Sequence, residues 1–166
     1  MISVKQIRWS PFFTGLSEEQ IAHIARAAEE YEVEPGFVFF NEGDDLDTFY
    51  LIQDGSVDIT IGIPDQEEEH KLVDQIFRTM KMEQITVSSL GVGDMFGWSA
   101  LISPHTSTAS AIASTLCRVI AVTCTELCTT WADDYEFAYK MVLKAAQTTR
   151  SRMRDLRIES LAFVST

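Results

Sequence analysis

Gly93-Asp94-Met95-Phe96-Gly97-Trp98-Ser99-Ala100-Leu101 is the most informative segment of the chain, and Thr108-Ala109-Ser110-Ala111 follows it after a short gap. A Gly-Asp turn, an extended pair and then Gly97 predict a turn that opens a short helical run. Backbone N–H groups at the start of a helix lack partners within it and stabilise an anion. The segment therefore predicts a phosphate-binding turn, although an ordinary corner between a strand and a helix shares these features.

Length and charge narrow the classes of protein to which the chain can belong. With 166 residues, 46% of them hydrophobic, we expect one domain over residues 1–166 with a core of its own. The formal net charge of -12 repels phosphodiester backbones, so no DNA binding is expected. Basic residues nevertheless gather near the C-terminus, which predicts either docking to an acidic partner or an ordinary solvated helix face. They are Lys140, Lys144, Arg150, Arg152, Arg154 and Arg157.

The three cysteines do not form a disulfide framework by spacing, and no signal segment opens the chain, so we expect a cytoplasmic location. No apolar run approaches the roughly 18 residues of a membrane span, so no membrane partner is expected. Cys124 and Cys128 share a helical face and could be joined by His23 or His70. Because no paired Cys-x-x-Cys or His-x-x-His unit supports a metal site, buried thiols are the favoured interpretation and no metal is predicted.

A helix is predicted to begin at Ser17, which can cap it while Gln20 completes a capping box. Apolar residues then recur at helical spacing over roughly a dozen residues. These are Ile21, Ile24, Ala25 and Ala28.

From Tyr31 onward the apolar residues alternate with a period of two, and glycines separate short runs rich in Val, Phe, Ile and Tyr. Residues 47–61 predict a β-hairpin around Asp54-Gly55, and later strands are predicted over 84–90, 107–113 and 118–122. Evenly spaced short strands favour a mainly β fold, with a barrel or jelly roll over about 30–123.

After residue 125 the period returns to that of a helix, which is predicted to continue to about residue 165. A narrow seam alternates spacings of four and three along it, and packing within one chain and self-association both explain such a seam. We favour a homodimer formed through this helix, because a complete barrel leaves it little to cover. The seam comprises Val142, Ala146, Thr149, Met153, Leu156, Ser160 and Phe163.

Four short motifs follow one another along the chain with characteristic spacing. They are Phe12-Phe13-x-Gly15-Leu16-Ser17, Pro35-Gly36-x-x-Phe39-x-x-Glu42-Gly43-Asp44, Tyr50-Leu51-Ile52-x-x-Gly55-x-Val57 and Leu90-x-x-Gly93-Asp94-x-Phe96-Gly97. Together they make the chain resemble the cyclic-nucleotide-binding domain of catabolite activators and kinase regulatory subunits. The resemblance implies a double-stranded β-helix, or jelly roll, of eight strands flanked by helices. It also implies that the long C-terminal helix pairs two subunits and closes over the ligand pocket.

The same resemblance implies a ligand and its site. The implied ligand is cyclic AMP, cyclic GMP or another small anionic molecule, held by backbone amides and hydroxyl groups at two neighbouring segments. The implied contacts with the base come from the C-terminal helix near Arg154 and Asp155. The remaining candidate ligand-binding residues are Phe96, Gly97, Trp98, Ser99, Ala100, Thr106, Ser107, Thr108 and Ala109.

Two positions depart from the family pattern. Trp98 stands where nucleotide-binding members have a Glu that holds the ribose, and Thr106 or Ser107 stands where they have an Arg that holds the phosphate. Losing one partner of a buried charge pair costs about 2 to 5 kcal/mol, so the phosphate site is expected to be degenerate. Stand-alone bacterial members that read Phe-Gly-Trp-Ser-Ala-Leu are the most similar branch, but they commonly keep that Arg.

Trp98 has two interpretations: a flat aromatic face that stacks a planar ligand, or a plug that fills the space for the sugar. His105 could supply partial positive charge nearby, although a single loop histidine is usually just solvated.

Residues 64–83 form an insertion with an acidic run, Glu67-Glu68-Glu69, and apolar residues at helical spacing. An extra amphipathic helix is predicted there, serving either as a partner-docking face or lid, or as packing on the barrel. Because the chain ends at Thr166, we expect no helix-turn-helix domain after the long helix, and signal output through an unknown protein partner.

Two functional hypotheses remain, and neither is enzymatic, because no nucleophile elbow or Walker-type loop is present. The first is a ligand-sensing regulatory module that signals through its C-terminal helix. The second is a structural or interaction module without ligand, whose pocket Trp98 closes. A sensor with haem or an iron–sulfur cluster is kept as a minor alternative to the first.

Overall fold

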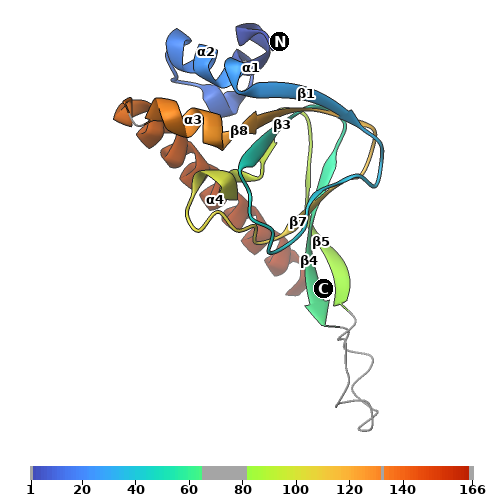
Figure 1. Cartoon of the computed structure of the whole chain (residues 1–166). Helices are drawn as coiled ribbons and strands as arrows, with labels where there is room; N and C mark the ends of the chain where they lie inside the picture. The colour runs from blue at the N-terminus through green and yellow to red at the C-terminus, as the bar shows by residue number, and fades with distance from the viewer. Residues whose placement is uncertain (1, 65–81, 132, 165–166) are drawn as a thin grey trace.

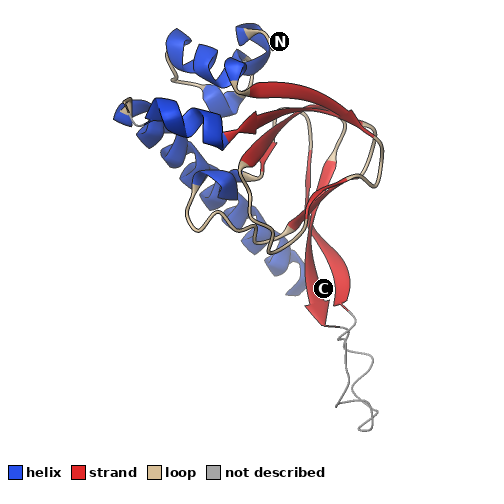
Figure 2. Ribbon diagram, in the orientation of Figure 1, coloured by secondary structure: helices blue, strands red, loops and turns tan. Residues whose placement is uncertain are grey.

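The computed structural model describes residues 2–64, 82–131 and 133–164. Two antiparallel sheets of four strands face each other, and the helices gather on one side of them (Figures 1 and 2). The strands are β1 Ala28–Val33, β2 Val38–Phe40, β3 Thr48–Asp54, β4 Val57–Pro64, β5 Met82–Leu90, β6 Met95–Phe96, β7 Ser110–Ala113 and β8 Cys117–Thr123. The helices are α1 Val4–Arg8, η1 Pro11–Phe13, α2 Glu18–Arg26, η3 Trp98–Leu101, α3 Cys124–Trp131 and α4 Tyr135–Val164.

The strand order is β1-β8-β3-β6 in the first sheet and β2-β7-β4-β5 in the second. Strands that follow one another in sequence therefore often belong to opposite sheets, as in a jelly roll. The predicted fold class, a mainly β jelly roll with N-terminal helices and a long C-terminal helix, is confirmed.

Side-chain alternation along β3 connects two separate cores. Phe49 and Leu51 point toward the helices, whereas Ile52 and the half-buried Tyr50 point between the sheets. The helical core, between the first sheet and the helices, includes Ile7, Phe13, Ile24, Ile120, Phe137 and Met141. The barrel core, between the sheets, includes Phe40, Val57, Leu90, Phe96, Ala111 and Val119.

The capping box predicted at the start of α2 is present. The Gln20 N–H donates to Ser17 Oγ, and the Ser17 N–H donates to Gln20 Oε1, each over 3.1 Å. The predicted helix was too long, however, because α2 ends at Arg26 and Ala28 pairs with Val122 of β8. Strand pairing with β8 outweighs the helical spacing of Ala28.

The predicted hairpin over residues 47–61 was wrong, although both of its strands exist. β3 pairs with β8 and β6, whereas β4 pairs with β5 and β7, so the Asp54-Gly55 turn carries the chain between sheets. Gly55 has φ +85°, and a Cβ there would lie 2.2 Å from the Leu116 carbonyl oxygen. The Cys117 thiol also donates to the Ser56 carbonyl over 3.0 Å. Close packing against the segment before β8 thus fixes the corner at which the chain passes from the first sheet to the second.

The strand predicted over residues 107–113 starts later than expected. Residues 107–109 form a loop because Ser107 exchanges backbone hydrogen bonds with Gly43 and Asp44, and β7 begins at Ser110. β4 and β5 remain paired out to Pro64 and Met82. The helix predicted within the 64–83 insertion falls on residues 65–81, outside the described residues.

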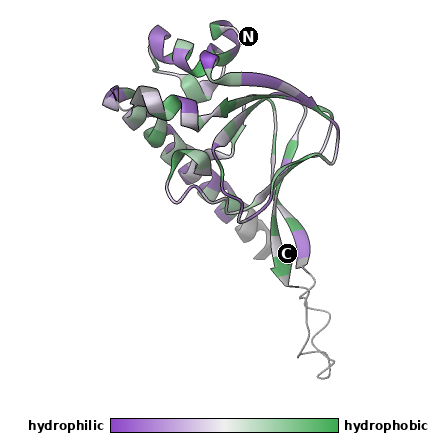
Figure 3. Ribbon diagram, viewed as in Figure 1, coloured by the Kyte–Doolittle hydropathy of each residue, from purple (hydrophilic) through white to green (hydrophobic). Residues whose placement is uncertain are grey.

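Helix α4 runs diagonally from the N-terminal helices toward the far end of the sheets (Figure 1). It buries Phe137, Met141 and Ala145 in the helical core. Members of the predicted seam remain exposed instead, including Val142 at 43% and Met153 at 50%, while side chains beyond residue 158 are not described. Figure 3 accordingly colours α4 in alternating hydrophobic and hydrophilic patches.

Within the described part of the chain, no helix combines the length and the apolar character needed to cross a bilayer.

Candidate ligand-binding site

The site begins at the turn before β6. The Gly91 N–H donates to Asp94 Oδ2 over 3.0 Å, and the backbone of the turn exchanges two hydrogen bonds with Ile52 of β3. β6 then pairs with β3 through Met95 and Phe96. The first sheet thus fixes the position of the turn predicted from the sequence.

Gly97 directs the chain from β6 into η3. It has a left-handed conformation with φ +75°, and an added Cβ would lie 3.0 Å from the Thr48 carbonyl oxygen. No side chain among the described residues caps η3 at Gly97. Only glycine combines this conformation with such close contact to β3, so the predicted strand-turn-helix geometry is present.

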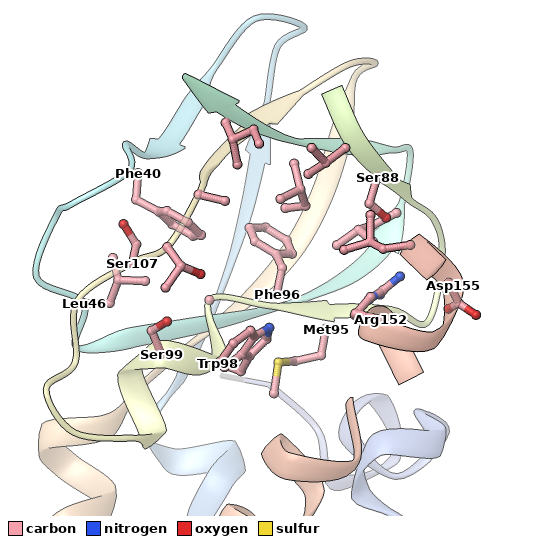
Figure 4. A pocket seen from close by; sticks show the side chains of 18 residues that line it. Phe40, Leu46, Ser88, Met95, Phe96, Trp98, Ser99, Ser107, Arg152 and Asp155 are labelled. Carbon is pink, nitrogen blue, oxygen red and sulfur yellow. The ribbon is translucent and has the colours of Figure 1, made fainter. Parts of the chain in front are cut away.

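Beside η3 lies a cavity of about 230 Å³, which we call the η3 cavity. Figure 4 shows Arg152 and Asp155 of α4 on one side, Phe40, Leu46 and Ser107 on the other, and Phe96 and Trp98 between them. Most of the lining is apolar. The volume is slightly below the roughly 300 Å³ at which pockets for drug-sized ligands begin, so the space suits a small guest.

Seven of the nine turn and strand residues singled out in the sequence line the η3 cavity: Phe96, Gly97, Trp98, Ser99, Ser107, Thr108 and Ala109. Ala100 does not, because it is buried in the helical core. Thr106 does not either, because its hydroxyl donates to Asp45 Oδ1 over 3.3 Å in a bridge to the preceding loop.

Helix α4 contributes residues that sequence reasoning identified only in part. Asp155 lines the η3 cavity, whereas Arg154 does not, and Arg152 lines it although it was not singled out. Arg152, Asp155 and Leu156 share one helical face at spacings of three and four. This spacing was readable in the sequence, but nothing in the sequence indicated which face of the helix points toward the barrel.

Among the described lining residues, Arg152 is the one cation and Asp155 the one anion. Arg152 Nη2 lies 3.3 Å from Asp94 Oδ1, so α4 is tied to the turn before β6 by an ion pair. Both side chains are partly exposed, and such a pair contributes at most about 1 kcal/mol. The guanidinium is therefore held at the edge of the cavity without being locked there.

The hydroxyl groups and the histidine near the η3 cavity have unequal roles. The buried Ser107 hydroxyl donates to the Asn41 carbonyl over 2.6 Å, so its proton is already engaged. His105 does not line the cavity: its Nδ1 lies 3.1 Å from the Ala100 carbonyl, which can only accept. The partial positive charge expected from His105 therefore lies outside the cavity, while Ser99 and Thr108 line it.

Two aromatic features line the η3 cavity between α4 and the side formed by Phe40 and Ser107 (Figure 4). Trp98 is half-buried, packs against the helical core and lines the η3 cavity without filling it. The rings of Tyr50 and Phe96 stack with centroids 5.0 Å apart and planes inclined by 15°. We call this ring pair the aromatic wall, and only Phe96 of the two lines the η3 cavity.

No cluster of three or more potential metal ligands occurs among the described residues. Cys124 is buried, and burial, with Cys128 and Asp47 nearby, raises the pKa of its thiol to about 12. Cys128 is exposed.

Comparison with known proteins identifies the family. The cyclic nucleotide-binding domain profile matches residues 30–127, more than half of the chain, so the chain belongs to the cyclic nucleotide-binding domain family. That family is generally regulatory and non-catalytic.

Solved structures share the fold. A Geobacter metallireducens GS-15 protein, named as a cyclic nucleotide-binding protein, is 26% identical with a TM-score of 0.74, covering 92% of this chain and 99% of that one. A cyclic nucleotide-binding domain from Methylobacillus flagellatus KT is 19% identical with a TM-score of 0.72, covering 96% and 80% of the two chains.

Among curated proteins, isozyme 1 of the cGMP-dependent protein kinase of Drosophila melanogaster is 27% identical over 186 residues. The match covers 99% of this chain but 22% of the kinase, so the chain spans about a fifth of the length of that relative.

Proposed function

We propose that this chain is a non-enzymatic regulatory module that binds a small anionic ligand, such as cyclic AMP or cyclic GMP, in the η3 cavity. One observation carries the proposal: α4 supplies Arg152, Asp155 and Leu156 to the cavity lining. A guest therefore contacts the same helix whose displacement can report occupancy to a protein partner.

Arg152 would hold the anion in place of the Arg that nucleotide-binding members of the family use for the phosphate. Arg152 can form charge-assisted hydrogen bonds with a phosphate group, to which η3 amides and the hydroxyls of Ser99 and Thr108 add neutral donors. Because Asp94 already pairs with Arg152, a bound phosphate competes with that carboxylate. Binding is then coupled to release of α4 from the turn, and affinity is lower than in a site with a dedicated Arg.

Thermal unfolding with and without nucleotide tests the proposal. A ligand at ten times its Kd stabilises the folded state by about 1.4 kcal/mol, which raises Tm by roughly 3 to 6 °C in a chain of this size. We expect such a rise with cyclic AMP or cyclic GMP at millimolar concentration, and none with adenosine, which lacks the phosphate. An unchanged Tm with both nucleotides rules out the nucleotide form of the proposal.

The second candidate is an interaction module without ligand, favoured by the packing of Trp98 against the helical core and by the small volume of the cavity. Ser107→Arg separates the two, because an open cavity that lacks only a cation gains nucleotide affinity. Since Ser107 is buried and bonded to Asn41, Thr108→Arg at an exposed lining position serves as the second variant. No gain in either variant favours the interaction module.

Three further features belong to this proposal. The exposed seam of α4, with Val142 and Met153, pairs two copies of the chain. The acidic chain acts in the cytoplasm without DNA or membrane contacts. Its output passes through protein contacts made by α4.

A further inference from the structure

A second cavity, of about 210 Å³, opens elsewhere between the two sheets. We call it the aromatic cavity. Its walls come from β1, β3 and β8 of the first sheet and from residues 37 and 39 at the start of the second. It shares no lining residue with the η3 cavity, and Tyr50 of the aromatic wall lines it, whereas Phe96 does not.

Four aromatic rings line the aromatic cavity: Tyr31, Phe37, Phe39 and Tyr50. The Phe37 and Phe39 rings are 5.2 Å apart and inclined by 79°, and the Phe39 and Tyr50 rings are 5.1 Å apart and inclined by 57°. Rings at such distances and angles are in edge-to-face or tilted contact, so the three rings form one continuous aromatic lining on this side of the cavity. Tyr31 and Phe37 are about half exposed, which leaves an entrance from solvent.

The charge around the aromatic cavity is negative. Glu29 lines it, and its Oε2 accepts the Tyr31 hydroxyl over 2.5 Å. Burial, and then the nearby Asp47 carboxylate, raise the pKa of Tyr50. None of the described residues that line the cavity is a lysine or an arginine. The strand β1 is hydrophilic along much of its length in Figure 3. Glu30 and Glu32 alternate along it with the lining residues Glu29, Tyr31 and Val33 and so lie on its other face.

We infer that the aromatic cavity binds a small organic cation with a quaternary ammonium head. Ring faces carry negative electrostatic potential and attract a cation within about 6 Å, while Glu29 supplies the counter-charge. An alkylated ammonium suits this site because its methyl groups bury apolar surface against the rings at low desolvation cost. Since the volume is below that of pockets for drug-sized ligands, the guest is a free small molecule. This inference does not depend on the function proposed for the η3 cavity.

Choline and its neutral carbon isostere, 3,3-dimethyl-1-butanol, test the inference with matched shapes. Each is titrated by NMR at constant ionic strength. We expect choline to bind and its N-methyl signal to move upfield, because the methyl groups lie over ring faces, while the isostere binds at least about ten-fold more weakly. Equal binding of both would indicate a merely hydrophobic pocket and overturn the inference, as would the absence of choline binding.

Variants locate the site. Phe37→Leu keeps apolar bulk but removes one ring face, and we expect choline affinity to fall about two- to five-fold, whereas Phe37→Trp retains it. Glu29→Gln removes the counter-charge at an exposed position and weakens choline further without changing the isostere. Tyr135→Leu, which removes an exposed ring at the start of α4, is the control and leaves binding unchanged. If both Phe37→Leu and Glu29→Gln bind choline like the wild type, the cation does not occupy this cavity.

Discussion

Asp94 is the residue that joins the turn before β6 to α4. One carboxylate oxygen accepts the Gly91 N–H and holds the turn, while the other faces Arg152. The two tasks use different oxygens, so they can be separated by substitution. The charge of Asp94 matters only toward Arg152, whereas an accepting oxygen is sufficient for the turn.

Asp94→Asn is expected to strengthen anion binding in the η3 cavity. The amide oxygen can still accept the Gly91 N–H, but Arg152 loses its competing carboxylate. Because an exposed ion pair is worth about 0.5 to 1 kcal/mol, cyclic nucleotide affinity rises roughly two- to five-fold. Isothermal titration calorimetry measures the change, and Arg152→Gln should move affinity the opposite way. Lower affinity in Asp94→Asn would mean that the ion pair helps to build the site.

Substitutions at Gly55 and Gly43 separate two destabilising effects, the cost of a positive φ and the cost of steric overlap with neighbouring atoms. Both have φ between +85° and +88°, but only Gly55 would bring a Cβ against neighbouring atoms, since nothing lies within 4 Å at Gly43. Gly43→Ala should therefore cost only the conformational term, about 1 to 2 kcal/mol. Gly55→Ala should cost clearly more, because the backbone near Leu116 must move. Urea unfolding compares the two, and equal losses would contradict the close packing of the corner.

At the scale of elements, α4 connects the N-terminal helices with the η3 cavity. Asp134 caps its first turn, since the Phe137 N–H donates to Asp134 Oδ1 over 2.9 Å and Gln20 Nε2 of α2 donates to the other oxygen over 3.3 Å. One turn from the middle, Lys144 Nζ donates to the Thr14 carbonyl. The helix is therefore anchored at its N-terminal half and reaches the η3 cavity with its other half.

Asp134→Ala is expected to lower Tm at neutral pH, and the difference should vanish in acid. The Phe137 N–H first, and then Gln20, lower the pKa of Asp134, so the folded state favours the carboxylate. A lowered pKa stabilises above the ordinary aspartate pKa of about 4 and loses its effect as pH falls through the lowered value. Tm measured between pH 3 and 7 gives the profile. Asp133→Ala, at the exposed neighbouring position, is the control, and a similar profile for it would argue against the cap.

Sequence patterns were reliable for elements whose determinants are local. The Ser17 and Gln20 capping box and the left-handed Gly97 before η3 follow from a few adjacent residues. The hairpin at Asp54-Gly55 failed because the partner of each strand is chosen by distant residues, β8 for β3 and β7 for β4. Arg152 was missed for a similar reason, because the rotation of α4 is set by burial of its Phe137 face.

In the whole molecule, two cores share the first sheet, and α4 links the helical core to the rim of the barrel. The residues that α4 buries in the helical core, Phe137, Met141 and Ala145, all lie in the first half of the helix. Apolar residues of the seam, Val142 within this half and Met153 beyond it, remain exposed in a single chain. A second copy of α4 is the proposed cover for them.

Replacing both Val142 and Met153 with Glu tests this pairing. We expect the wild type to sediment as a dimer and the double variant as a monomer, because four added charges would face one another across the seam. Leu116→Glu, an exposed apolar position outside α4, should remain dimeric. Analytical ultracentrifugation distinguishes the species. A monomeric wild type would show that the exposed seam serves another partner.

The aromatic wall has a consequence for energetics across the barrel. Tyr50 faces one cavity and Phe96 the other, and Phe39 contacts both rings at centroid distances of 5.1 and 4.9 Å. A guest that tilts one ring must disturb its stacked neighbour, because close-packed rings cannot move independently. Thermodynamic linkage makes any such influence reciprocal. If a ligand in one cavity changes the affinity of the other cavity for its ligand by some factor, the second ligand changes the affinity for the first by the same factor. An anion in the η3 cavity and a cation in the aromatic cavity would then change each other's affinity through the single pair of stacked rings that separates them.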